Sequence, residues 1–183
     1  MIDAKNVGRI AERIVANELE FRGFRVSDLN KEGTSANADL LAVSPGRTLQ
    51  VQVKGATNGP KDRWWIGYGA CNEQIIAPRK EQVFNRRESF YKANYVVLVA
   101  VRSPQEYSCI VLPIREAERA AQMHLDAGYR LPTRTGQPRK PHKMYIELEP
   151  SPRARTAHHW ANERKLLARF RDKLGWERLL QSN

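Results

Sequence analysis

Three polar residues in otherwise apolar segments have the types that metal-assisted hydrolysis requires. Asp39 opens the apolar run 40–43, and Gln52 and Lys54 lie within the next run, Leu-Gln-Val-Gln-Val-Lys at positions 49–54. Side chains two positions apart on a strand point to the same face, so we expect Gln52 and Lys54 side by side. Carboxylate and amide oxygens suit a hard divalent cation, and a lysine beside them suits an attacking water. The pattern therefore predicts a metal-dependent phosphodiesterase site.

The order of these motifs resembles the PD-(D/E)xK nuclease superfamily, which includes restriction endonucleases and archaeal Holliday-junction resolvases. Asp39 matches the first acid of that pattern, Gln52 stands where the second acid usually stands, and Lys54 matches the lysine. Upstream, the segment 8–26 is similar to the family's first helix and first strand, and Glu12 matches a further metal-binding glutamate on that helix.

The resemblance covers roughly residues 5–115, where the apolar runs 94–101 and 109–114 look like later core strands. It implies an α/β fold with a restriction-endonuclease-like core, in which helices flank a mixed central sheet. We expect three parts: a nuclease-like core at 1–128, a basic Pro- and Gly-rich arm with a short strand and linker at 129–152, and a basic C-terminal helix at 153–183.

The resemblance also implies a Mg²⁺-dependent endonuclease, with Mn²⁺ as the alternative cofactor. We assign Asp39 as the main metal ligand, Glu12 as the second and the Gln52 amide oxygen as the third, and the family adds the Val53 carbonyl. Lys54 would orient or activate the attacking water and stabilise the pentacovalent state. Glutamine in place of the second acid removes one negative charge, so metal affinity should be lower.

Three other interpretations stay open. The chain could be a nucleic-acid-binding module of the same fold whose catalysis is weakened by Gln52. It could instead be an interaction protein that binds another protein through aromatic and basic surfaces. In the third interpretation, Asp39, Gln52 and Lys54 are only a polar face of a half-exposed sheet.

The charge of the chain favours a polyanionic partner. The formal net charge is +11 and the pI is about 10.0, with 8 basic and 7 acidic residues in 1–54 but 8 basic and 3 acidic in 151–183. Neutralising phosphates releases counterions, so nucleic acid is the expected partner, with DNA preferred to RNA. A basic protein without such a partner is the alternative. The expected nucleic-acid-binding residues are Arg63, Arg79, Lys80, Arg86, Arg87, Arg134, Arg139, Lys140, Lys143, Arg164, Lys165 and Arg169.

The elements that must position the site follow from hydrophobic periodicity and turn residues. We expect a helix at 7–21 that stops at Gly23, and a short strand at 24–26 followed by a loop at 27–37. Further on, the predicted elements are strands at 39–43 and 48–54 joined by a Pro-Gly turn, a helical segment at 73–93, strands at 95–101 and 108–114, a helix at 114–127, a short strand at 145–148 and a helix at 156–180. In the aromatic run 64–68, we expect one tryptophan in the core and the other at the surface.

The rest of the sequence limits the compartment and the assembly. No run approaches the ~20 apolar residues of a membrane-spanning helix, and the N-terminus lacks the apolar core of a signal peptide. Cys71 and Cys109 are expected to be free buried thiols in a reducing compartment. We therefore expect a cytoplasmic protein without a membrane partner. Homodimerisation is expected from the family resemblance alone, because two strands must be cut.

Overall fold

The computed structural model describes residues 4–30, 38–57, 63–66, 69–76, 81–86, 93–103, 105–128, 144–147 and 159–181. The helices are α1 (Ala4–Phe21), α2 (Ile114–Gly128), α3 (His159–Ala168) and α4 (Asp172–Gln181). The strands are β1 (Arg25–Asp28), β2 (Leu40–Ser44), β3 (Arg47–Ala56), β4 (Arg63–Ile66), β5 (Gly69–Ile76), β6 (Glu81–Arg86), β7 (Tyr95–Val101), β8 (Tyr107–Pro113) and β9 (Met144–Glu147).

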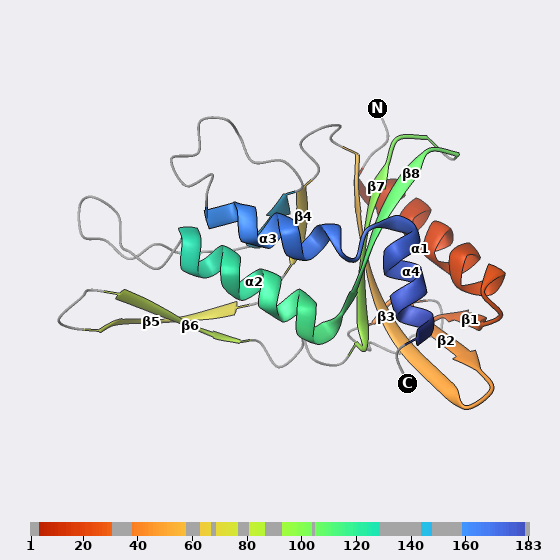
Figure 1. Cartoon of the computed structure of the whole chain (residues 1–183), viewed down its shortest axis with the longest axis horizontal. Helices are drawn as coiled ribbons and strands as arrows, with labels where there is room; N and C mark the ends of the chain where they lie inside the picture. The colour runs from red at the N-terminus through yellow and green to blue at the C-terminus, as the bar shows by residue number, and fades with distance from the viewer. Residues whose placement is uncertain are drawn as a thin grey trace.

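A five-stranded mixed sheet forms the centre of the molecule, with strand order β1-β2-β3-β7-β8. Only the β3–β7 pair within this sheet is parallel, while β1–β2, β2–β3 and β7–β8 are antiparallel. Helices α1 and α4 lie on one side of the sheet and α2 and α3 on the other (Figure 1). The predicted α/β fold with a mixed, helix-flanked sheet is therefore confirmed.

The central strand β7 separates two hydrophobic cores. All seven of its residues are buried. Val97 and Val99 face the core shared with α1 and α4, whereas Val96 and Leu98 face the core shared with α2 and α3. A strand buried on both faces reads as a continuous apolar run, which explains why the sequence predicted this element so clearly.

Most elements lie where hydrophobic periodicity predicts them. The strands at 39–43, 48–54, 95–101 and 108–114 and the helices at 7–21 and 114–127 are confirmed to within a few residues. Gly23 follows α1 with φ +87°, and Gly46 forms the β2–β3 turn with φ +74°. Both backbone angles lie in the left-handed region that glycine adopts without strain.

Two predicted elements are wrong. The segment 73–93, predicted to be helical, contains the antiparallel strands β5 and β6 where the structure describes it, because pairing between strands outweighs local composition. The loop predicted at 27–37 is also wrong at its start, since β1 continues to Asp28 and pairs with β2.

The helix predicted at 156–180 is two helices, α3 and α4, with a break between them at 169–171. The break lies along β8: the Val111 N–H donates to the Phe170 carbonyl at 2.9 Å, and the Cys109 N–H donates to Asp172 Oδ1 at 2.8 Å. Asp172, the first residue of α4, has φ +48°, and this left-handed backbone conformation changes the direction of the chain between the two helices. A Cβ on Gly175 would lie 2.1 Å from the Phe170 carbonyl oxygen, so this junction tolerates only glycine there.

Trp64 is the tryptophan of the aromatic run that belongs to the core. It is 1% exposed, and its indole N–H donates to the Val99 carbonyl at 3.1 Å. It packs in the core shared with α2 and α3. The prediction of one core tryptophan is confirmed, and the side chain of Trp65 lies outside the described residues.

Cys109 is a buried free thiol, as predicted, and burial raises its pKa to about 12. A thiol with such a pKa stays protonated at neutral pH and is a poor nucleophile. The side chain of Cys71 lies outside the described residues. None of the helices that the structure describes combines the length and apolarity needed to span a membrane.

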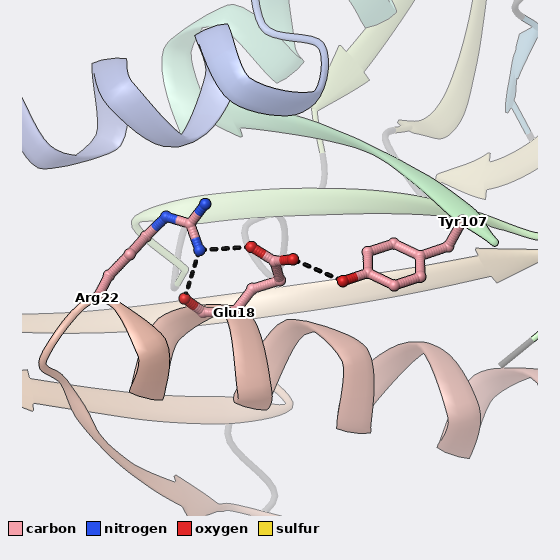
Figure 2. Close-up of polar contacts among 3 residues, drawn as sticks. All are labelled: Glu18, Arg22 and Tyr107. Atoms are coloured by element: carbon pink, nitrogen blue, oxygen red, sulfur yellow. Dashed lines mark hydrogen bonds and ion pairs between the residues drawn. The ribbon is translucent and has the colours of Figure 1, made fainter. Parts of the chain in front are cut away.

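A polar network of Glu18, Arg22 and Tyr107 joins α1 to β8 (Figure 2). The Arg22 guanidinium forms an ion pair with the Glu18 carboxylate and donates to the Glu18 main-chain carbonyl, while the Tyr107 hydroxyl donates to Glu18 Oε1 at 2.6 Å. Arg22 also lies 4.7 Å from the ring centroid of Trp176 on α4. Glu18 therefore has a structural role.

This network should make stability fall at alkaline pH. The hydrogen bond to Glu18 is the largest cause that raises the pKa of Tyr107 from 10.0 to about 12. Because the folded-state pKa is raised, the contribution is complete below about pH 10 and is lost as the pH rises from about 10 to about 12. We expect the free energy of unfolding in urea to fall more in this range for the wild type than for Tyr107→Phe. Equal falls in the two proteins would contradict the proposed coupling.

Candidate functional site

Asp39 is fixed at the start of β2 by bonds to strands on both sides. Its main-chain N–H donates to the Val51 carbonyl at 2.9 Å, and its carbonyl accepts the Leu29 N–H at 3.0 Å. The carboxylate accepts the Val53 N–H at 2.6 Å and a weaker bond from the Asn30 side chain at 3.4 Å. These bonds orient the half-buried carboxylate beside β3, which is the strand that carries the other predicted site residues.

The end of the β2–β3 pairing sets the relation of Asp39 to β3. The last paired residues are Leu40 and Val51, and the Asp39 N–H bonds to the Val51 carbonyl, so Asp39 lies directly beyond the paired register. Gln52 and Lys54, two positions apart on β3, point to the same face of the sheet. Both are half-buried, in alternation with the buried Val51 and Val53. Two of the predicted residues thus share one face, and the Asp39 carboxylate is bonded to the strand that carries them.

Glu12 approaches from the other side, on α1. The helix touches β3 closely: a Cβ on Gly55 would lie 2.9 Å from both the Ala11 Cβ and the Val7 carbonyl oxygen. Only glycine permits this approach, which holds α1 against β3 next to Lys54, while Glu12, the neighbour of Ala11, lines the pocket toward Val26, Asp28 and Leu40. The position of Gly55 directly after Lys54 is therefore part of how the fold builds the site.

The charges of these residues act on one another. Burial is the largest cause that raises the pKa of Glu12, and the carboxylates of Asp39 and Asp28 raise it further. Lys54 and Arg9 lower it, so both cations lie within electrostatic range of the carboxyl group. Glu12 is thus electrostatically coupled to Asp39 and Lys54, although its helix covers the opposite face of the sheet from Gln52 and Lys54.

Asp28 is a residue of this region that sequence reasoning missed. It lies at the end of β1, opposite Leu40 in the register, and accepts the Asn30 N–H at 3.0 Å. Asp28 fell within the loop predicted at 27–37, because the preceding strand was expected to end at Val26. An open pocket of about 140 Å³ between α1 and the first two strands is lined by Arg9, Glu12, Arg13, Ala16, Val26, Asp28 and Leu40.

The residues predicted as metal ligands carry oxygen donors. Glu12 and Asp39 have carboxylates, and Gln52 has an amide. In the part of the chain that the structure describes, no three His, Cys, Asp or Glu side chains are grouped as metal ligands. Two acids and an amide are compatible with Mg²⁺, which keeps several waters and binds through one or two carboxylates. Burial raises the pKa of Glu12 most, and the nearby carboxylates raise it further; a divalent cation close by would favour the ionised form.

The predicted nucleic-acid-binding residues are only partly described. Arg164 is half-buried on α3, and Lys165 and Arg169 are exposed near its C-terminal end. For Arg63 on β4 and Arg86 on β6 only the backbone is described. The predictions outside the described residues are Arg79, Lys80, Arg87, Arg134, Arg139, Lys140 and Lys143.

Comparisons with known proteins find a likeness that covers nearly the whole chain. No known protein family matches the sequence, and no curated protein matches it. Among solved structures, the chain is similar to a bacterial homing endonuclease, I-Ssp6803I, at 16% sequence identity, and the match covers 99% of this chain and 94% of that one. The TM-score is 0.49, and a likeness of this degree does not carry residue roles or activity from one chain to the other.

Proposed function

We propose that this protein is a metal-dependent nuclease of the PD-(D/E)xK type, which hydrolyses phosphodiester bonds in DNA. The observation that carries the proposal is the Asp39 carboxylate bonded to the Val53 N–H of β3, between Gln52 and Lys54, whose side chains share one face, with the Lys54 charge acting on Glu12. A lysine beside oxygen donors is the combination that phosphodiester hydrolysis needs. Repair, resolution and restriction are the pathways that such an activity would serve.

Each residue has a role that its surroundings support. Mg²⁺, or Mn²⁺ in its place, would polarise the phosphate and lower the pKa of the attacking water. Asp39, Glu12, the Gln52 amide oxygen and the Val53 carbonyl would hold the ion. Lys54 would orient the water and stabilise negative charge on the phosphoryl oxygens. The bond from the Val53 N–H fixes the Asp39 carboxylate before the ion arrives, which reduces the ordering cost of binding.

The remaining expectations complete the proposal. The net charge of +11 favours a nucleic-acid partner, and Lys165 on α3 and Arg169 directly after it are exposed to solvent. Cutting both strands of a duplex calls for two active sites, so we propose a homodimer that acts in the cytoplasm. The divisions at 1–128, 129–152 and 153–183 stay predictions, with substrate choice assigned to the arm and the C-terminal segment.

One observation favours a second candidate function, a nucleic-acid-binding module without efficient catalysis. Gln52 replaces a charged ligand with a neutral one, and the described residues hold no cluster of three acidic, histidine or cysteine ligands. A site with one fewer negative charge binds divalent cations more weakly. Such a module would bind nucleic acid in a salt-sensitive way and leave it intact.

A cleavage assay decides between the two functions. Labelled duplex, single-stranded, flap and four-way-junction DNA, with matched RNA, is incubated with the protein in Mg²⁺, Mn²⁺ or EDTA. We expect cleavage in Mg²⁺ or Mn²⁺ and none in EDTA. The Lys54→Ala variant, purified in parallel, controls for contaminating nucleases. Binding without cleavage in either metal would reject the nuclease and support the binding module.

The Gln52→Glu substitution should strengthen the metal site. The added carboxylate lies on β3, the strand whose Val53 N–H is bonded to Asp39, and it supplies the charge that glutamine lacks. We expect half-maximal cleavage at a Mg²⁺ concentration several-fold lower than in the wild type, measured by titrating the metal at fixed substrate. Isothermal titration with Mn²⁺ provides a readout that does not depend on activity. An unchanged or weaker metal requirement would remove Gln52 from the ligand set.

A further inference from the structure

Two arginines on α1 flank the candidate site and have no place in the roles assigned above. Arg9 and Arg13 are both exposed, and both line the open pocket together with Glu12 and Asp28. Residues four positions apart on a helix lie on the same face, one turn above the other, so the two guanidinium groups follow the helix along the pocket. The sequence alone gave no reason to separate them from other basic residues.

Arg22, which directly follows the same helix, provides a useful contrast. Its guanidinium is committed to Glu18 and lies over Trp176, which makes it part of the fold. In the part of the chain that the structure describes, Arg9 and Arg13 form no such ion pair or side-chain hydrogen bond. Arg9 nevertheless acts on the site, because its charge lowers the pKa of Glu12. These two arginines are thus near the carboxylates but available to a ligand.

The carboxylates of this region repel a phosphate ligand, and the two arginines can offset that repulsion. Glu12, Asp28 and Asp39 lie close enough for the two aspartates to raise the pKa of Glu12, and a polyanion would be repelled by the same charges. Arginine donates paired N–H groups in the planar geometry that fits phosphate oxygens. Two such groups along the pocket would hold the backbone beside the acids and leave the acids free to hold a cation.

We propose that Arg9 and Arg13 bind phosphates of the nucleic-acid backbone at this pocket, so that the exposed edge of α1 is a contact surface for that backbone. The proposal extends the proposed function at the same site, but it concerns binding and does not require catalysis. Phosphate contacts fix the register of the strand and carry no base information, so these residues are positioning residues.

The test measures the affinity for nucleic acid as a function of salt. Arg9→Gln/Arg13→Gln is compared with the wild type by fluorescence anisotropy in EDTA, where no metal-dependent cleavage occurs, using labelled duplex and four-way-junction DNA. Arg115→Gln/Arg119→Gln is the matched control, because it removes the same charge at the same spacing from exposed positions on α2. All three proteins are checked for equal thermal stability.

We expect the Arg9/Arg13 variant to bind more weakly and to show a shallower dependence of log affinity on log salt, by about 0.9 for each lost contact on B-DNA and about 1.8 for both. The α2 control should keep the wild-type slope. Equal slopes in the wild type and the Arg9/Arg13 variant, equal losses in both variants, or no DNA binding by the wild type would each overturn the proposal.

The outcomes separate this proposal from the nuclease proposal. A reduced slope specific to Arg9 and Arg13, in a protein that never cleaves, would keep the contact surface and reject the nuclease. Cleavage by a protein whose Arg9/Arg13 variant binds with the wild-type slope would keep the nuclease and reject the contact surface.

Discussion

Replacing Lys54 with alanine should abolish metal-dependent cleavage while DNA affinity stays close to that of the wild type. The ammonium group lies on the same face as Gln52 and acts on Glu12, so its loss removes charge stabilisation that matters most in the transition state. Loss of one preorganised electrostatic group costs roughly 10²–10³ in kcat. Single-turnover cleavage and anisotropy binding, performed on the same preparation, separate the two effects.

Asp39→Ala should give the same phenotype with an added loss of stability. It removes the proposed metal ligand and also the acceptor of the Val53 N–H, whose exposure to an apolar environment costs about 1–3 kcal/mol. Asp39→Asn keeps an acceptor and should recover the stability but not the cleavage. Lys173→Ala, at an exposed position on α4, is the control for a change of charge away from the site. Cleavage that survives in both Lys54→Ala and Asp39→Ala would reject the assigned site.

Trp64→Ala should cause the largest loss of stability among the single substitutions considered. The indole ring is buried between the sheet and helices α2 and α3, and its N–H satisfies the Val99 carbonyl. Truncating a buried tryptophan to alanine costs about 3–5 kcal/mol, a large part of the 5–15 kcal/mol by which a native domain is stable. Urea unfolding followed by far-UV circular dichroism measures this loss as a lower midpoint.

Trp64→Phe separates the packing of this residue from its hydrogen bond. Phenylalanine keeps an aromatic ring in the core but leaves the Val99 carbonyl without the indole donor. We expect this variant to lie between the wild type and Trp64→Ala. A loss below about 1 kcal/mol for Trp64→Ala would show that β4 is not integral to the core.

The helices and strands that could be predicted from the sequence are those whose buried residues recur at regular positions along the chain. α1 buries one stripe, β3 alternates buried and half-buried residues, and β7 is buried throughout. Each pattern is local, so it can be recognised without knowledge of the partner. The shared face of Gln52 and Lys54 follows from the same alternation.

The features that escaped prediction depend on partners distant in sequence. β5 and β6 form through pairing with each other, and the break between α3 and α4 forms where residues 169–171 meet β8. The approach of α1 to Gly55 likewise depends on a contact between segments more than forty positions apart, which no local pattern encodes. The coupling of Glu12 to Lys54 therefore required the structure, and the role of Asp28 required the extent of β1.

The junction between α3 and α4 has a consequence for how copies of this chain can associate. β8 is an outer strand, and its Cys109 and Val111 N–H groups are taken by Asp172 and Phe170. An outer strand with satisfied donors cannot template the strand of another molecule, so this side of the sheet is protected from domain swapping and amyloid-like stacking. The other outer strand, β1, has only four residues and carries charge at both ends. Association of two copies through the edges of the central sheet is therefore disfavoured.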